Sequence, residues 1–152
     1  MSCPAYCYEN GQIKETEPFS GAMWMNFRGI NRKIRTVEHA HDEPVTMGLM
    51  ADKYLKGAKN AYFKYGGFGV DFAEPLYRMG LLSQEPVDVK GTTIVPMDLA
   101  LAQTPPAPKY PDQIKANLDE GLEYEEGAFL IRVDGEKDGK PVRIDNYVNA
   151  PG

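Results

Sequence analysis

The chain has 152 residues and a formal net charge of −5; 42% of its residues are hydrophobic and 26% are charged. This length and balance are those of one ordinary globular domain with a real core. The acidic charge gives no electrostatic basis for nucleic-acid binding. No apolar run is long enough to cross a membrane, and the N-terminus lacks the basic start and apolar centre of a signal peptide.

Cys3 and Cys7 are the only cysteines. One such pair makes neither a zinc site nor a disulfide framework. We therefore expect free thiols in a reducing compartment and a cytoplasmic protein.

The first half of the chain predicts a hairpin, a strand and a helix in succession. Asn10-Gly11 between short apolar runs is a strong hairpin signal. Alternation over 33–39 indicates a strand. Pro44 and the helical spacing of apolar residues predict a helix over 44–55, which Gly57 would close in a left-handed conformation.

The second half continues the mixture of helices and strands. We expect an aromatic strand over 60–65 and a helix over about 71–79 that Gly80 caps. A strand or hairpin over 87–95 and a short helix over 97–102 should follow. A stiff connector over 104–108 then leads to a terminal hairpin, in which 127–133 pairs with 142–148. This pattern predicts an α+β fold, with a mixed, largely antiparallel sheet covered by two or three helices, in a single domain over residues 1–152.

Polar chemistry concentrates in HAHDEPVT, residues 39–46. On a strand, His39 and His41 point to the same face, and with Glu43 they could bind a transition metal. A cupin-type metal site is disfavoured, because Glu43 follows His41 too closely and the chain has no third histidine. We therefore predict no metal site.

Three other features could contact a ligand. The turn Gly66–Gly69 lacks the G-x-G-x-x-G pattern of dinucleotide sites, so a structural turn is the better interpretation. The arginines of residues 28–35 could hold a carboxylate, although a solvated surface is the simpler role. Lys64 and Tyr65 end a predicted strand, where side chains often face a cleft.

Several blocks, taken in order, resemble a known family. They are YENGQIKETEPFSG, HAHDEPVT, NAYFKYGG, LYRMGLLSQEPVDVKG, TIVPMDLAL and the hairpin GAFLIRVDGEKDGKPVRIDNYVNAPG. Together they resemble the C-terminal domain of saccharopine dehydrogenase-like oxidoreductases, the group that includes saccharopine reductase and lysine 6-dehydrogenase. The segment MWMNFRGINRKIRT is longer and more basic than in that family, and the Rossmann domain that precedes this domain there is missing. We therefore expect a domain excised from a longer chain.

The resemblance implies that the intact protein moves a hydride between NAD or NADP and an amino-acid C–N bond. This domain would contribute the wall of the substrate site and a homodimer interface, while its own Rossmann domain, absent here, would bind the dinucleotide. No cofactor is expected in this chain, and the fragment alone should be inactive.

Carried over by position, the resemblance implies catalytic roles for His41 and Glu43. It implies substrate binding by Thr46, Lys64, Tyr65 and Arg35. A neutral histidine suits proton removal from an amine. Glu43 could equally face the positive end of its helix, with His41 holding the turn. The alternatives are a stand-alone ligand-binding or dimerisation module and, ranked below it, a metal-dependent cupin-like enzyme.

Overall fold

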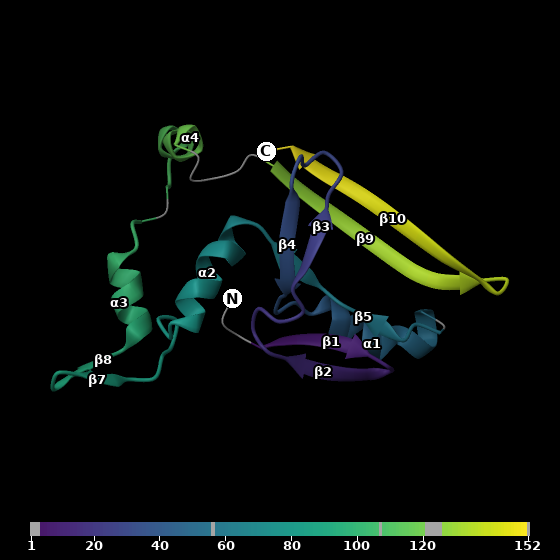
Figure 1. Cartoon of the computed structure of the whole chain (residues 1–152), viewed down its shortest axis with the longest axis horizontal. Helices are drawn as coiled ribbons and strands as arrows, with labels where there is room; N and C mark the ends of the chain where they lie inside the picture. Colours follow the sequence, from purple (N-terminus) through teal and green to yellow (C-terminus); the bar gives the residue numbers. More distant parts are fainter. Residues whose placement is uncertain (1–3, 56, 107, 121–125, 152) are drawn as a thin grey trace. The chain divides into compact units, whose positions relative to one another are not determined.

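The computed structural model describes residues 4–55, 57–106, 108–120 and 126–151 (Figure 1). In chain order its elements are β1 (Ala5–Glu9), β2 (Gln12–Thr16), β3 (Met23–Asn26), β4 (Lys33–Glu38), α1 (Glu43–Tyr54), β5 (Asn60–Ala61), β6 (Lys64–Gly66), α2 (Phe68–Arg78), β7 (Val87–Val89), β8 (Thr92–Ile94), α3 (Pro96–Gln103), α4 (Pro111–Asp119), β9 (Glu126–Lys137) and β10 (Lys140–Pro151). The predicted α+β class is confirmed, with the strands divided among small antiparallel sheets.

The chain divides into two compact units. The first unit comprises Met1–Met23 and Arg35–Pro105, and the second comprises Trp24–Ile34 and Pro106–Gly152. Each unit therefore contains two separate stretches of sequence.

In the first unit, β1 and β2 form the hairpin that Asn10-Gly11 predicted. Both turn residues have positive φ, 53° for Asn10 and 81° for Gly11, as a two-residue type I′ turn requires. The other edge of β1 pairs with β5. Helix α1 lies so close to β1 that a Cβ atom on Gly48 would be 2.6 Å from the ring of Tyr8.

A second sheet has the order β3-β4-β6, and α2 packs beside it. Val37 of β4 and Val70 of α2 are completely buried, and they form a small core with Phe19. Tyr77 of α2 extends this core, with its ring centroid 5.3 Å from that of Phe19. This core fixes α2 against the strand that leads to the histidine segment.

Two predicted elements need correction. The strand expected over 60–65 is two short strands, because β5 pairs with β1 whereas β6 pairs with β4. Helix α2 starts at Phe68, three residues earlier than expected, so part of the glycine turn is helical. Its end agrees with prediction: Gly80 has φ 76°, and the N–H groups of Gly80 and Leu81 donate to carbonyls of the last helical turn.

The remaining elements are partly as expected. The β7-β8 hairpin turns at Lys90-Gly91, and α3 starts at Pro96. Strand β3 and helix α4 had not been predicted. The β9-β10 hairpin is longer than expected, because its loop is only Asp138-Gly139; residue 107 of the proline connector lies outside the described residues.

Within the described ranges, no helix is long and apolar enough to cross a membrane.

Candidate functional site

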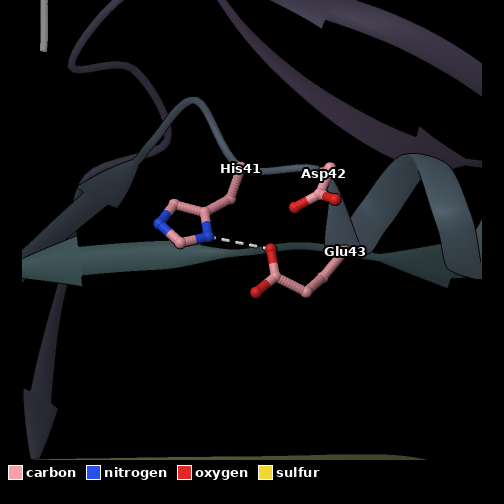
Figure 2. Close-up of side chains that lie close together, drawn as sticks. All are labelled: His41, Asp42 and Glu43. Atoms are coloured by element: carbon pink, nitrogen blue, oxygen red, sulfur yellow. Dashed lines mark hydrogen bonds and ion pairs between the residues drawn. The ribbon is translucent and has the colours of Figure 1, made fainter.

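The histidine segment connects the end of β4 to the start of α1, all within the first unit. His41 and Glu43 interact directly, with 2.8 Å between His41 Nδ1 and Glu43 Oε2 (Figure 2). Their side chains are 40% and 53% exposed, so a solute can reach both. The two residues assigned catalytic roles from the sequence are therefore brought together at the surface.

Glu43 is the first residue of α1, where backbone N–H groups point outward and the helix dipole is positive. A hydrogen bond from its own backbone N–H holds the pKa of Glu43 below its ordinary value, and His41 adds to this effect. The carboxylate is therefore ionised at neutral pH. In that state it accepts a hydrogen bond from the Nδ1–H of His41 and holds the ring in one orientation.

Four aromatic rings of the first unit lie in a row, which we call the aromatic row. The His41 ring stacks on Phe63, with centroids 3.8 Å apart and planes 11° apart. His39 lies 5.4 Å from His41 on one side and 5.4 Å from Tyr65 on the other. The aromatic row therefore connects the segment after β4 with Tyr65 of β6 and with Phe63, the residue that precedes β6.

His39 differs from His41 in being partly buried. Its Nδ1 atom is buried and has no hydrogen-bond partner. Burial lowers the pKa of His39, and the neighbouring His41 lowers it further. His39 is therefore held neutral inside the row, while His41 keeps contact with solvent.

The only group of described residues with the geometry of a metal site is His41, Asp42 and Glu43, whose ligand atoms lie within 4.8 Å of one another. The sequence had suggested His39, His41 and Glu43 as ligands, but His39 does not belong to this group. All three residues are exposed, and both carboxylates lie at the positive end of α1, which stabilises them without a cation. The geometry does not favour a resident metal.

The two predicted carboxylate-binding cations already have acidic partners. Lys64 Nζ donates to the carbonyl of Gly21 over 2.6 Å and lies 3.5 Å from a carboxylate oxygen of Glu38. Arg35 donates to Glu74, which also accepts from Arg78. Burial opposes ionisation of Glu74, but these hydrogen bonds outweigh it and lower its pKa. A substrate carboxylate would have to displace one of these partners.

Thr46 and Tyr65 are both exposed, and the Thr46 N–H donates to the Asp42 carbonyl in the first turn of α1. Phe63, Glu38 and Glu74 also contact the predicted site residues, and none of the three had been predicted. The aromatic content of NAYFKYGG pointed to Phe63, whereas nothing in the sequence pairs Glu74 with Arg35. A shallow surface hollow lined by Tyr77, Arg78, Gly80, Leu82 and Ser83 contains none of the predicted site residues.

The glycine turn does not fit a dinucleotide phosphate. Gly67 has φ 108° and precedes α2, and its carbonyl accepts hydrogen bonds from Val70 and Asp71. Asp71 places a carboxylate in the first turn of α2, where a phosphate would otherwise be attracted. This geometry supports the structural turn that the sequence favoured.

The comparisons with known proteins add no identity to this geometry. No protein-family model matches the chain, and no curated protein sequence is significantly similar to it.

Proposed function

We propose that this chain is the substrate-binding and dimerisation domain of an NAD(P)-dependent oxidoreductase that acts on an amino-acid C–N bond, with a substrate of the saccharopine or lysine type. The order of the sequence blocks from YENGQIKETEPFSG to the terminal hairpin supports the family. The observation that carries the proposal is the exposed His41–Glu43 pair at the start of α1.

The pair has the composition needed to take a proton from a substrate amine. When Nδ1 of His41 donates to Glu43, the lone pair available to a substrate is on Nε2. An amine hydrogen-bonded there can lose its proton to the imidazole, and the ionised Glu43 stabilises the imidazolium that forms. Glu43 is in this role a positioning residue for His41.

The surroundings suit the two ends of an amino-acid substrate. The carboxylates of Asp42 and Glu43 attract an ammonium group, and the face of the aromatic row offers apolar and cation–π contact. Tyr65 and Thr46 add exposed hydroxyl groups. Lys64 and Arg35 remain the candidates for the substrate carboxylate, each in exchange with its present acidic partner.

We expect no dinucleotide site in this domain, because the glycine turn lacks the G-x-G-x-x-G pattern and Asp71 lies in the first turn of the helix that follows it. In the intact protein NAD(P) would accept or supply the hydride from a separate domain. The residues described here would bind the amino acid and exchange the proton of its amine.

A thermal melt of the chain against lysine, saccharopine, glutamate, NADH, NADPH and zinc tests the proposal. A ligand that binds only the folded state raises the midpoint. We expect a rise with one or more of the amino acids and none with the dinucleotides. His41→Ala and Glu43→Gln should abolish that rise, because each removes one member of the pair.

Asp52→Asn is the matched control, since Asp52 is an exposed carboxylate on the same helix, α1. It should leave the rise unchanged. A rise with a dinucleotide would contradict the excised-domain proposal and favour a stand-alone module. A rise with zinc alone, lost in Glu43→Gln, would favour the metal-dependent alternative.

A further inference from the structure

The β9-β10 hairpin of the second unit has two chemically different faces. The strands pair without interruption from Glu126↔Pro151 to Lys137↔Lys140, as the long ribbon in Figure 1 shows. Directly opposite residues point to the same side of such a ribbon, and neighbours along a strand point to opposite sides. The register therefore determines which side chains share a face.

Away from the turn, one face is almost entirely apolar, and we call it the apolar face. From the Phe129↔Val148 pair to the Gly135↔Val142 pair it carries Phe129, Ile131, Val133, Val142, Ile144 and Val148, with Gly135 and Asn146 between them. Lys137 and Lys140 lie on the same side next to the turn. The exposed fractions of the six large side chains run from 38% for Val142 to 61% for Phe129. Six hydrophobic side chains on one face are therefore exposed to solvent.

The opposite face carries two cross-strand ion pairs next to the partly buried side chains of Leu130 and Tyr147. Arg132 makes two hydrogen bonds to Asp145, and Arg143 makes two to Asp134, each across the strand pair. The hydrogen bonds from these guanidinium groups lower the pKa of both aspartates. The four charged groups of this face are therefore paired with one another.

The second unit also has no buried hydrophobic core among its described residues. The buried hydrophobic residues all belong to the first unit: Ala5, Cys7, Tyr8, Phe19, Val37, Ala51 and Val70. A two-stranded hairpin alone is marginally stable in water unless another layer covers its apolar side. The apolar face therefore requires an occupant.

The exposed area fits a second copy of the same face. Six half-exposed aliphatic and aromatic side chains leave roughly 500 Å² of apolar surface, at the upper end of what a monomer tolerates. Two such faces in contact would bury about 1,000 Å² in total, which reaches the lower limit of a specific interface. A charged or polar partner would leave its own groups unpaired against these six side chains, whereas a second copy brings the same six apolar side chains. Lys137 and Lys140, which are exposed next to the turn, can stay in solvent.

We infer that the apolar face of β9-β10 is the homodimer interface, with two copies packed face to face around a two-fold axis. Two twisted ribbons packed this way form a small β-sandwich with the charged faces outside. The inference rests on the dimerisation role in the proposed function and assigns that role to specific residues. It makes no use of the histidine site.

The test is the oligomeric state of the whole chain by sedimentation velocity over a range of concentrations. The wild-type protein should dimerise. Ile131→Asp should raise the dimer dissociation constant by at least ~100-fold, because the buried charge occurs twice across the two-fold axis. Ile131→Thr should weaken the dimer less, and it serves as the readout if the aspartate variant fails to fold by circular dichroism.

Leu49→Asp is the matched control, because Leu49 is an even more exposed apolar side chain on α1 in the first unit. It should dimerise like wild type. A monomeric wild type would overturn the inference, and destabilisation of that monomer by Ile131→Asp would show that the same chain covers the face. Equal dimerisation of all variants would overturn it by placing the interface elsewhere.

The amino-acid melt separates this result from the proposed function. A folded monomeric Ile131→Asp that still responds to an amino acid supports both ideas. Dimerisation without any amino-acid response supports the interface alone, and an amino-acid response in a monomeric wild type supports the ligand site alone.

Discussion

At the scale of single residues, burial controls the charge of His39. Its Nδ1 atom is buried without a partner, and the protonated ring would lie against the second imidazole of the aromatic row. Its pKa is therefore lower in the folded chain than in the unfolded chain, where it keeps its ordinary value. Between these two values the unfolded state binds more protons, so acidification favours unfolding.

His39→Phe should weaken this pH dependence. Phenylalanine keeps the ring between His41 and Tyr65 but cannot be protonated. The wild-type contribution is complete above the ordinary histidine pKa and is lost as the pH falls towards the lower folded value. The difference in melting midpoint between about pH 7.5 and pH 5.5 should therefore be smaller in the variant than in wild type. An unchanged difference would show that His39 does not titrate in this range.

Only contacts between residues close together in the sequence could be predicted for the candidate site. His41 and Glu43 are two residues apart and Pro44 marks the start of a helix, so their meeting could be predicted. The partners of Lys64 and Arg35 depend on the packing of β4 and α2 and come from 26 and 39 residues away. No periodicity in the sequence encodes such pairings.

At the scale of elements, α1 and β1 are held at close range by Gly48. Alanine in a helix is ordinarily more favourable than glycine by about 1 kcal/mol. Here the added methyl group would lie 2.6 Å from the buried ring of Tyr8. Gly48→Ala should therefore lower the free energy of unfolding by about 2 kcal/mol, because helix and strand must separate.

Urea unfolding measures this effect. Met47→Ala, a change at an exposed position of the same helix, should shift the free energy of unfolding by less than ~0.5 kcal/mol. Shortening Tyr8 to leucine in the Gly48→Ala background should recover part of the loss. A stabilised Gly48→Ala would contradict the close approach of α1 to β1.

Turns were the most predictable elements, since their chemistry is contained in two residues. Asn10-Gly11 and Lys90-Gly91 both adopt the positive φ values that such pairs favour. Asp138-Gly139 carries the same signal, but the surrounding polar residues had suggested a longer loop. The break between β5 and β6 was not predictable from local sequence, because each half pairs with a different distant strand.

At the scale of the whole molecule, the two units differ in how their strands are protected. The first unit has its own buried core, whereas the hairpin of the second unit depends on what covers its apolar face. Dilution that separates the inferred dimer should therefore speed hydrogen exchange in β9 and β10. Exchange in β4, beside Val37 and Val70, should stay slow.

Exchange followed by mass spectrometry at two protein concentrations gives the comparison. Ile131→Asp should show fast hairpin exchange at both concentrations, and wild type only at the lower one. Concentration-independent protection of β9 and β10 would argue against cover by a second copy.

The two units also alternate along the sequence. Trp24–Ile34 belongs with Pro106–Gly152, although the intervening residues complete the first unit at Pro105. On a ribosome that adds ~5–20 residues per second, this short segment emerges several seconds before the hairpin with which it groups. All residues of the first unit are made before that hairpin exists. During synthesis, therefore, Trp24–Ile34 cannot contact the rest of its own unit until residues 106–152 have been made.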